Sequence, residues 1–443
     1  MTGQVLAPDL TWTGERFEAG VRVTVGADGR IAAVERGAAG ATLDDGAGAE
    51  VRRLRRRALL PGFVDAHSHA FQRGLRGLGE TFPAGAGDFW SWREEMYALV
   101  ARLYRERLYE LCLAAFREMR AAGITTVGEF HYLHHADPAR RDFAFDEVVL
   151  AAAAAAPIRI VLLETFYASG GIKKPLAGVQ ERFATPDPAA FWAQLDRLAG
   201  RLAADGSQSL GCVAHSVRAA TPRQIADLHA EARRRGLPFH MHVEEQRQEI
   251  ADCEAAYRRR PMALLLDELE IDAGFTAVHC THTAPDDLER FVAAGGNVCV
   301  CPLTEANLGD GIPPLAAVPA ARGRLCLGSD SNARISMLEE ARWLEYGQRL
   351  AGERRGALRD GRGRFAAGLL AAATENGARA LAVEAGAVAP GLWADFVTVD
   401  LDHPQLAGSE PGHLAEALLL GCGDGVLDET CLAGRWRPCA ELR

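Results

Sequence analysis

The sequence predicts an α/β protein: a (β/α)8 barrel of the TIM type, with a small β-sandwich domain built from both ends of the chain. Between residue 58 and about residue 385, apolar runs typical of buried strands alternate with amphipathic helical segments. Most apolar runs end in polar residues, as expected for barrel strands whose carboxyl ends surround a site. Toward both ends of the chain, the pattern turns to short strands separated by turns. An open, doubly wound sheet is the alternative, but it would not gather all eight strand ends around one pocket.

Eight apolar runs are the predicted barrel strands. They read as nearly continuous apolar segments because a parallel barrel sheet is buried on both faces. The helix predicted at 221–236 has the clearest limits, with Thr221 at the N-cap, Pro222 at the first helical position and Gly236 just past the end. The predicted strands lie at residues 58–69, 124–132, 158–167, 210–217, 238–245, 275–282, 296–305 and 324–332.

We expect two domains. Residues 1–57 and 386–443 form the two halves of the β-sandwich domain, and residues 58–385 form the barrel as an insertion between them. The arginine-rich run VRRLRRR at 51–57 is interpreted as solvated charge on an edge strand that leads into the barrel.

Composition narrows the range of partners. The formal net charge of -10 and the pI of about 5.8 argue against a nucleic-acid partner. No apolar run approaches the roughly 20 residues that cross a bilayer, and the N-terminus lacks the features of a secretory signal. We therefore expect a cytoplasmic protein without membrane association. The ten scattered cysteines form no CxxC pair and predict reduced, mostly buried thiols.

The HxH pattern of His67 and His69 is the first sign of a metal site. Residues i and i+2 of a strand point to the same side, so both imidazoles aim at one point. Alone, the pattern would fit ordinary polar residues at a strand end equally well. His242 ends the fifth predicted strand and Asp330 the eighth, which completes a three-histidine, one-aspartate set. Such a set suits one divalent ion, zinc most naturally, with iron and manganese as alternatives.

Three residues near these ligands are candidates for proton transfer. A divalent ion lowers the pKa of a coordinated water toward neutrality, and Asp330 can accept the proton of that water. Glu245, three residues after His242, can deliver a proton to a leaving nitrogen. A solvated loop carboxylate is the other interpretation of Glu245, since Glu244 lies beside it. His279, at the end of the sixth strand, can hydrogen-bond the water or the developing negative charge.

Other polar residues at the strand ends are candidates for substrate binding. Arg218 and His215 end the fourth strand, and an arginine directed into a barrel mouth needs an anionic partner. Tyr132 and Gln72 can add hydrogen bonds. Arg93, in FWSWREEMY, fits a surface helix better when its local sequence alone is considered. Two arginines near a metal would suit an anionic small molecule, with a dicarboxylate among the candidates.

The cluster formed by His131, His134 and His135 could be mistaken for a second metal site. We interpret these residues as structural, together with His229, His282, His403 and His413. No lysine stands at a predicted strand end, where a carbamylated side chain could bridge a second metal. These observations favour a one-metal site.

Several motifs resemble known families. The segments PGFVDAHSHAFQR (61–73), HVEE (242–245) and GSDS (328–331) resemble the amidohydrolase superfamily in its mononuclear deaminase branch. Between about residue 58 and about residue 350, the chain is more narrowly similar to the formimidoylglutamate deiminase family. That similarity is carried by HSHAFQRGLRG, FWSWREEMY, EFHYLHH, HSVRAATP, TEANLGDGI and EEARWLEYGQRL.

The resemblance implies an activity: hydrolysis of N-formimidoyl-L-glutamate to N-formyl-L-glutamate and ammonia in histidine degradation, by a homodimer. It implies His67, His69, His242 and Asp330 as metal ligands and Glu245 as the proton-transferring carboxylate. It also implies substrate contacts for Gln72, Arg93, Tyr132, His215 and Arg218, which reverses the surface interpretation of Arg93. Asn332 departs from the pattern, since a histidine is expected at that position.

Two other functions stay open at this point. One is a related deaminase that acts on a guanine, pterin or guanidino compound, which would need aromatic or amide contacts to a ring; the arginine pair argues against it. The other is a non-catalytic binding protein that keeps the barrel, and the intact set of ligands and carboxylates argues against that.

Overall fold

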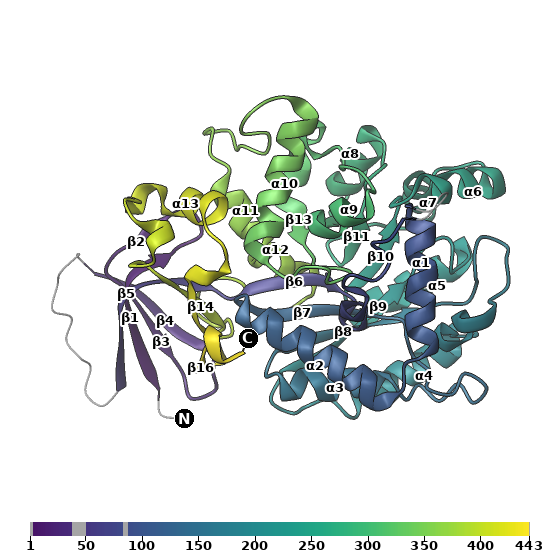
Figure 1. The fold of residues 1–443 in the computed structure, drawn as a ribbon, viewed down its shortest axis with the longest axis horizontal. Helices are drawn as coiled ribbons and strands as arrows, with labels where there is room; N and C mark the ends of the chain where they lie inside the picture. Colours follow the sequence, from purple (N-terminus) through teal and green to yellow (C-terminus); the bar gives the residue numbers. More distant parts are fainter. Residues whose placement is uncertain (1–2, 38–49, 83–86, 443) are drawn as a thin grey trace.

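The computed structural model describes residues 3–37, 50–82 and 87–442, and it confirms the predicted fold class. Eight parallel strands form one sheet in the order β13-β12-β11-β10-β9-β8-β7-β6, and helices surround it (Figure 1). The barrel strands are β6 (Phe63–Ser68), β7 (Ile124–His131), β8 (Arg159–Phe166), β9 (Gln208–Ala214), β10 (Phe239–Val243), β11 (Phe275–His279), β12 (Asn297–Val300) and β13 (Leu325–Leu327).

The barrel closes at a short seam between its first and last strands. Ser68 and Asp330 form an isolated parallel bridge. The backbone N–H of Asp330 donates to the carbonyl of His67 at 2.9 Å, and the N–H of His69 donates to the carbonyl of Asp330, also at 2.9 Å. The seam therefore joins the backbones of three of the four predicted metal ligands.

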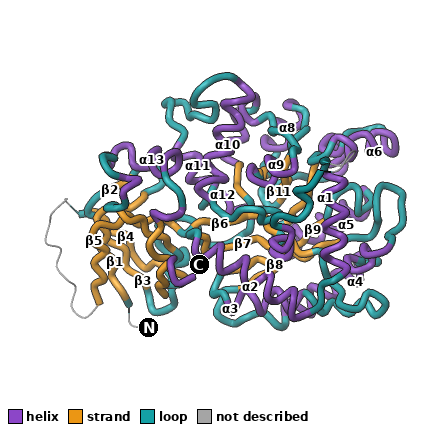
Figure 2. Tube along the Cα trace, in the orientation of Figure 1, coloured by secondary structure: helices purple, strands orange, loops and turns teal. Residues whose placement is uncertain are grey.

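The helices pack around the barrel and cap several strand ends (Figure 2). Helix α5 begins and ends where the sequence predicts: Thr221 caps it in a capping box with Gln224, and Gly236 ends it with a φ of 68°. The helices are α1 (Phe89–Ala101), α2 (Arg105–Ala121), α3 (Asp146–Ala155), α4 (Pro188–Ala199), α5 (Pro222–Arg235), α6 (Arg247–Tyr257), α7 (Pro261–Glu268), α8 (Pro285–Ala293), α9 (Pro302–Leu308), α10 (Met337–Gly352), α11 (Ala366–Ala372), α12 (Glu375–Ala380) and α13 (Leu414–Gly421).

Both ends of the chain contribute to a second sheet, which lies beside the barrel as the purple and yellow strands of Figure 1. Its order is β16-β15-β14-β5-β1-β3-β4, with β2 paired to β1. The proposed division at residue 57 falls within β5, which leads from this sheet into the barrel; the exact boundaries stay a prediction. The strands are β1 (Gln4–Trp12), β2 (Phe17–Glu18), β3 (Val21–Val25), β4 (Ile31–Arg36), β5 (Glu50–Pro61), β14 (Phe396–Asp400), β15 (Leu427–Leu432) and β16 (Arg435–Pro438).

A buried ion pair and stacked cations connect the two sheets. Arg159 of β8 contacts Asp395, beside β14, with its Nε 2.9 Å from Oδ2. The guanidinium groups of Arg159 and Arg30 lie 4.2 and 4.3 Å from the ring centre of Trp393. Because Arg159 belongs to a barrel strand while Asp395 and Trp393 lie just before β14, its contacts hold the terminal sheet against the barrel; the Arg30 contact lies within the terminal sheet region.

The interior matches the expectations from composition. All ten cysteines are buried, and they take no part in disulfides. Among the helices that the structure describes, none combines the length and the apolar character needed to cross a membrane.

Gly328 offers a test of the barrel seam. A Cβ at this position would lie 2.7 Å from both the Cβ and the carbonyl oxygen of His67. We expect Gly328→Ala to lower the free energy of unfolding by about 1–3 kcal/mol, because backbone and a packed side chain must move apart. Urea unfolding measures this. Gly323→Ala is the matched control, since a Cβ there meets nothing within 4 Å. Equal stability of the two variants would contradict the prediction.

Candidate active site

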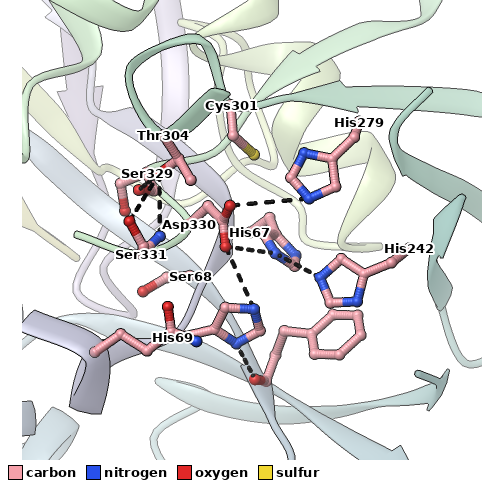
Figure 3. Close-up of polar contacts among 12 residues, drawn as sticks. His67, Ser68, His69, His242, His279, Cys301, Thr304, Ser329, Asp330 and Ser331 are labelled. Atoms are coloured by element: carbon pink, nitrogen blue, oxygen red, sulfur yellow. Dashed lines mark hydrogen bonds and ion pairs between the residues drawn. The ribbon is translucent and has the colours of Figure 1, made fainter. Parts of the chain in front are cut away.

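Three imidazoles and one carboxylate converge at the carboxyl end of the barrel strands (Figure 3). His67 Nε2 and His69 Nε2 each lie 3.4 Å from Asp330 Oδ1. His242 Nε2 lies 3.3 Å from His67 Nε2. All four residues are buried, and their potential ligand atoms lie within 4.8 Å of one another. The structure thus brings together the four residues that the sequence predicted as metal ligands.

Backbone carbonyls orient two of the imidazoles. His69 Nδ1 lies 2.7 Å from the carbonyl oxygen of Phe130, and His242 Nδ1 lies 3.1 Å from that of His215. Each Nδ1 therefore carries the proton, and each Nε2 presents a lone pair to the centre of the cluster. Burial lowers the pKa of all three histidines, that of His69 to about 3. The three imidazoles are therefore neutral at physiological pH.

Asp330 supplies the negative charge of the cluster. Burial acts against its ionised form, but the hydrogen bond and charge of His67, together with His279 and His69, keep its pKa below the usual value. Three neutral nitrogen donors and one carboxylate in a buried pocket form a donor set that suits a divalent cation such as zinc. The residues present therefore fit a single ion at this position.

Asp65 holds the two strands of the seam together through hydrogen bonds. Its Oδ1 accepts the backbone N–H groups of His67 at 3.3 Å and Ser329 at 3.0 Å, and its Oδ2 accepts the Ser329 hydroxyl. Burial raises the pKa of Asp65 to about 7. Our sequence analysis missed this residue. The available signal was a carboxylate two residues before the HxH pair, inside an otherwise apolar strand.

Asn332 has a similar supporting role. Its amide Nδ2 lies 3.0 Å from the Ser68 hydroxyl and 3.1 Å from the carbonyl oxygens of both His69 and Asp330. The side chain thus binds the backbone beneath the ligands, and it is not among the residues that line the cavity. Asn332 therefore makes supporting backbone contacts at the position where the family resemblance led us to expect a histidine.

Backbone conformations that non-glycine residues rarely adopt gather around the site. Positive φ angles occur at Glu244 (53°), His279 (71°), Cys280 (54°), Asp330 (49°) and Asn332 (57°). Each residue follows or ends a barrel strand. Residues held in this way usually cluster at functional sites, because the surrounding structure must enforce them.

His279 faces three carboxylates. Its Nδ1 lies 3.2 Å from Glu305, and its Nε2 lies 3.8 Å from Asp330 and 3.9 Å from Glu245. Burial opposes protonation, but Glu245, the Glu305 hydrogen bond and Asp330 outweigh it and raise the pKa of His279 to about 10. Glu305 thus orients a ring whose Nε2–H points toward the reaction centre.

The structure separates the two neighbouring glutamates. Glu245 lines the cavity beside His279. Glu244 instead accepts the backbone N–H of Met262 at 3.1 Å and lies 3.5 Å from Arg260. Because it is buried among these partners, Glu244 serves the local fold, and Glu245 is the carboxylate available for proton transfer.

A cavity of about 340 Å³ opens over the cluster. Gln72 donates from Nε2 to the Tyr132 hydroxyl at 2.8 Å, and burial raises the pKa of Tyr132 well above its usual value. The five residues predicted to bind substrate all line this cavity: Gln72, Arg93, Tyr132, His215 and Arg218.

Arg93 enters the cavity from α1, outside the barrel strands. Its guanidinium lies 4.5 Å from the ring centre of Trp90 and 5.4 Å from that of Tyr97. Its Nε is buried, and it has no hydrogen-bond partner within the described ranges. A partly buried cation with stacking partners and no carboxylate among the described residues leaves its donors free for an anionic ligand.

Sequence reasoning missed part of the cavity wall. Most of these residues lie on α1, in the loop after β8 or on the helix after β10, where no predicted strand end marks them; Tyr167 ends a predicted strand but was not given a role. The missed residues include Tyr97, Tyr167, Lys174, Phe183, Gln248 and Asp252.

The other histidine cluster lies outside the cavity. His131 Nε2 and His134 Nδ1 each lie 3.1 Å from Asp146 Oδ1, and His135 Nε2 lies 2.8 Å from the carbonyl oxygen of Ala184. Gln194 also donates to Asp146. The donor atoms of His131, His134 and Asp146 are close enough to hold an ion, yet each already has a hydrogen-bond partner. A structural role for this cluster stays our prediction.

Comparisons with known proteins identify the family. The model of the amidohydrolase family matches residues 58–436. The chain belongs to the amidohydrolase family.

Relatives narrow the position within that family. The chain is 40% identical over 388 residues to the formimidoylglutamate deiminase of Pseudomonas aeruginosa, which covers 86% of this chain and 84% of the relative. It is 30% identical to a 5-methylthioadenosine/S-adenosylhomocysteine deaminase of Natronomonas pharaonis, in a match that covers 94% of this chain and 87% of the relative. Among solved structures, an amidohydrolase from Brucella melitensis matches with a TM-score of 0.86 and 30% identity, over 98% of this chain and 94% of that one. The resemblance to formimidoylglutamate deiminase is thereby confirmed.

Asp65 allows a test of how the seam supports metal binding. We expect Asp65→Asn to weaken metal affinity by about 10–100-fold, because an amide nitrogen would face donors that now meet a carboxylate. Equilibrium dialysis against a competing chelator, followed by metal analysis, measures the change.

Asp227→Asn, on the exposed surface of α5, is the matched control and should bind metal like the unchanged protein. Full metal affinity in the Asp65 variant would show that the seam does not depend on this carboxylate.

Proposed function

We propose that this chain catalyses the hydrolytic deimination of N-formimidoyl-L-glutamate to N-formyl-L-glutamate and ammonia, in histidine degradation. The enzyme is a hydrolase acting on the carbon–nitrogen bond of a linear amidine. One observation carries the choice of substrate: Arg93 and Arg218 line the same cavity as the candidate metal ligands and Glu245. The similarity to the Pseudomonas formimidoylglutamate deiminase supports the same choice.

The two arginines suit the two carboxylates of a glutamate derivative. Arg93 offers a guanidinium without a carboxylate partner among the described residues, and Arg218 offers one that is already close to Glu245. Planar guanidinium groups bind carboxylates through paired hydrogen bonds. Tyr132, Gln72 and His215 add neutral polar groups to the same wall. The cavity can therefore hold a dianionic ligand whose other end reaches the metal ligands.

The chemistry divides among the residues at the closed end of the cavity. A divalent ion held by His67, His69, His242 and Asp330 supplies an activated water when it is bound. Asp330 accepts a proton from the attacking water at its carboxylate. Glu245 pairs with the amidine nitrogen, accepts the second proton of the water oxygen and passes it to that nitrogen, which leaves as ammonia once it has also received the proton held by Asp330. His279 donates from Nε2 to the oxygen that becomes the formyl oxygen.

Zinc is the proposed ion, since histidine nitrogens and a carboxylate suit it, and iron and manganese remain alternatives. A cytoplasmic homodimer that binds neither nucleic acid nor membrane is likewise our proposal. It rests on composition and on the resemblance to the family.

Another deaminase activity is the second candidate. Aromatic rings at Phe89, Trp90 and Trp92 line the cavity and could stack on a purine or pterin, and the similarity to a deaminase of methylthioadenosine points the same way. Arg93, however, already occupies a face of Trp90. A neutral ring would also leave Arg93 without an opposite charge, because no described carboxylate pairs with it, and this favours the dicarboxylate.

A substrate panel tests the assignment. We expect the purified protein, loaded with zinc, to release ammonia from N-formimidoyl-L-glutamate faster than from N-formimidoyl-L-aspartate, and to leave guanine unchanged. A coupled ammonia assay measures all three. Faster turnover of guanine would replace our assignment with the second candidate, and loss of bound metal without loss of turnover would overturn the mechanism.

Arg93 gives a test of carboxylate binding. We expect Arg93→Met to raise KM for N-formimidoyl-L-glutamate by roughly 10–100-fold, because one charge-assisted contact is lost. Steady-state kinetics measure it. The control is Arg102→Met at the exposed end of the same helix, whose KM should match that of the unchanged enzyme. An unaltered KM in the Arg93 variant would remove this residue from the binding site.

Glu245 gives a test of proton transfer. We expect Glu245→Gln to lower kcat by about 10²–10⁴-fold, because the amide cannot accept and return a proton. Metal content, measured on the same sample, should stay at that of the unchanged enzyme, since Glu245 is not one of the proposed ligands. A kcat near that of the unchanged enzyme would assign the proton transfer to another group.

A further inference from the structure

A third glutamate stands behind the proposed substrate-binding arginine. Glu249 lies in the first turn of α6 and is fully buried. Its Oε2 lies 3.3 Å from Arg218 Nε, while Arg218 Nη2 lies 3.5 Å from Glu245 Oε2. The three side chains form a chain from Glu249 through Arg218 to Glu245. Neither the sequence motifs nor the proposed mechanism gives Glu249 a role.

The contacts hold Arg218 by one edge. Arg218 Nε and Glu249 Oε2 are both buried, and within the described ranges neither has a hydrogen-bond partner of its own. Their ion pair is therefore the interaction that holds Nε of the guanidinium. Glu249 is itself held, since its Oε1 accepts the backbone N–H of Glu244 at 3.4 Å. The ring of Phe89 lies under the guanidinium, with its centre 5.8 Å from Cζ.

Arg218 Nη2, which lies beside Nε on the same edge, contacts Glu245, and the outer edge of the guanidinium is formed by Nη1 and Nη2. A guanidinium has two edges that can pair with a carboxylate through two hydrogen bonds. Without Glu249, the guanidinium of Arg218 could rotate toward Glu245 and form two hydrogen bonds with its carboxylate. Glu245 would then be neutralised by Arg218, and Arg218 would be lost to the substrate.

We propose that Glu249 is a positioning residue that keeps Arg218 from pairing fully with Glu245, so that the substrate carboxylate can take the outer edge of the guanidinium. When that carboxylate binds, it competes with Glu245 for Arg218 and releases Glu245 toward the amidine nitrogen. Recognition of the carboxylate and availability of the proton-transferring group are thus coupled through one arginine. This inference rests on the function proposed above.

A double-mutant cycle on the zinc-loaded enzyme tests the proposal. The variants are Glu249→Gln, Arg218→Met and the two combined, assayed with N-formimidoyl-L-glutamate. We expect Glu249→Gln to raise KM by about tenfold or more, as loss of a charged contact does. Because Glu249 acts through Arg218, adding Glu249→Gln to Arg218→Met should change KM by less than about twofold. Such strong non-additivity marks residues that work as one unit.

A merely structural role would give a different pattern. The effects of the two substitutions would then add in the double variant, and that result would overturn the proposal. Glu254→Gln, on the exposed side of the same helix, is the matched control and should leave KM unchanged. If Glu249→Gln does not fold, as judged by circular dichroism, Glu249→Asp withdraws the carboxylate by one methylene and supports the same cycle.

An assay of the unchanged enzyme distinguishes failure of this proposal from failure of the proposed function. If it releases no ammonia from N-formimidoyl-L-glutamate, the function itself is wrong. If it does, and the cycle is additive or Glu249→Gln keeps its KM, the function stands and the role of Glu249 is wrong.

Discussion

The active site depends on how the barrel closes. The first and last strands meet over only a few residues, and the hydrogen bonds between them run through the backbones of His67, His69 and Asp330. The same contacts that complete the barrel therefore set the spacing of the candidate metal ligands. Asp65 and Asn332 reinforce this junction from the side away from the cavity. Fold and ligand geometry cannot vary independently here, because a shift of either strand moves a ligand.

Charge is divided along the cavity. Neutral imidazoles, Asp330 and Glu245 lie at its closed end, while Arg93 lies on the wall contributed by α1. A partly buried cation without a counter-ion is stabilised by a ligand that supplies the missing charge. The arrangement therefore favours a molecule with an electrophilic carbon at one end and carboxylates at the other. Arg218 lies between these regions, in contact with the carboxylates of Glu245 and Glu249.

Sequence patterns predicted the parts of the site that follow strand geometry. The barrel and the side-by-side placement of His67, His69, His242 and Asp330 follow from strand ends that meet at one rim. Arg93 could be assigned only through family resemblance, because a helix arginine has no local mark of its direction. Asp65, Asn332 and Glu249 were not assigned roles, since their importance lies in contacts with residues distant in the sequence. Glu244 binds Met262 and Arg260 and takes no part in the cavity, and no local sequence pattern connects these two residues to it.

The left-handed backbone conformations at His279, Asp330 and Asn332 bear on how the stability of the folded protein depends on metal binding. Such conformations cost of order 1–3 kcal/mol each, and binding of a cation to the folded state alone offsets that cost. The rim of the barrel is then the part of the molecule whose folded structure depends most on a bound metal ion. Without a bound ion, the chain would therefore open at this rim more readily than elsewhere.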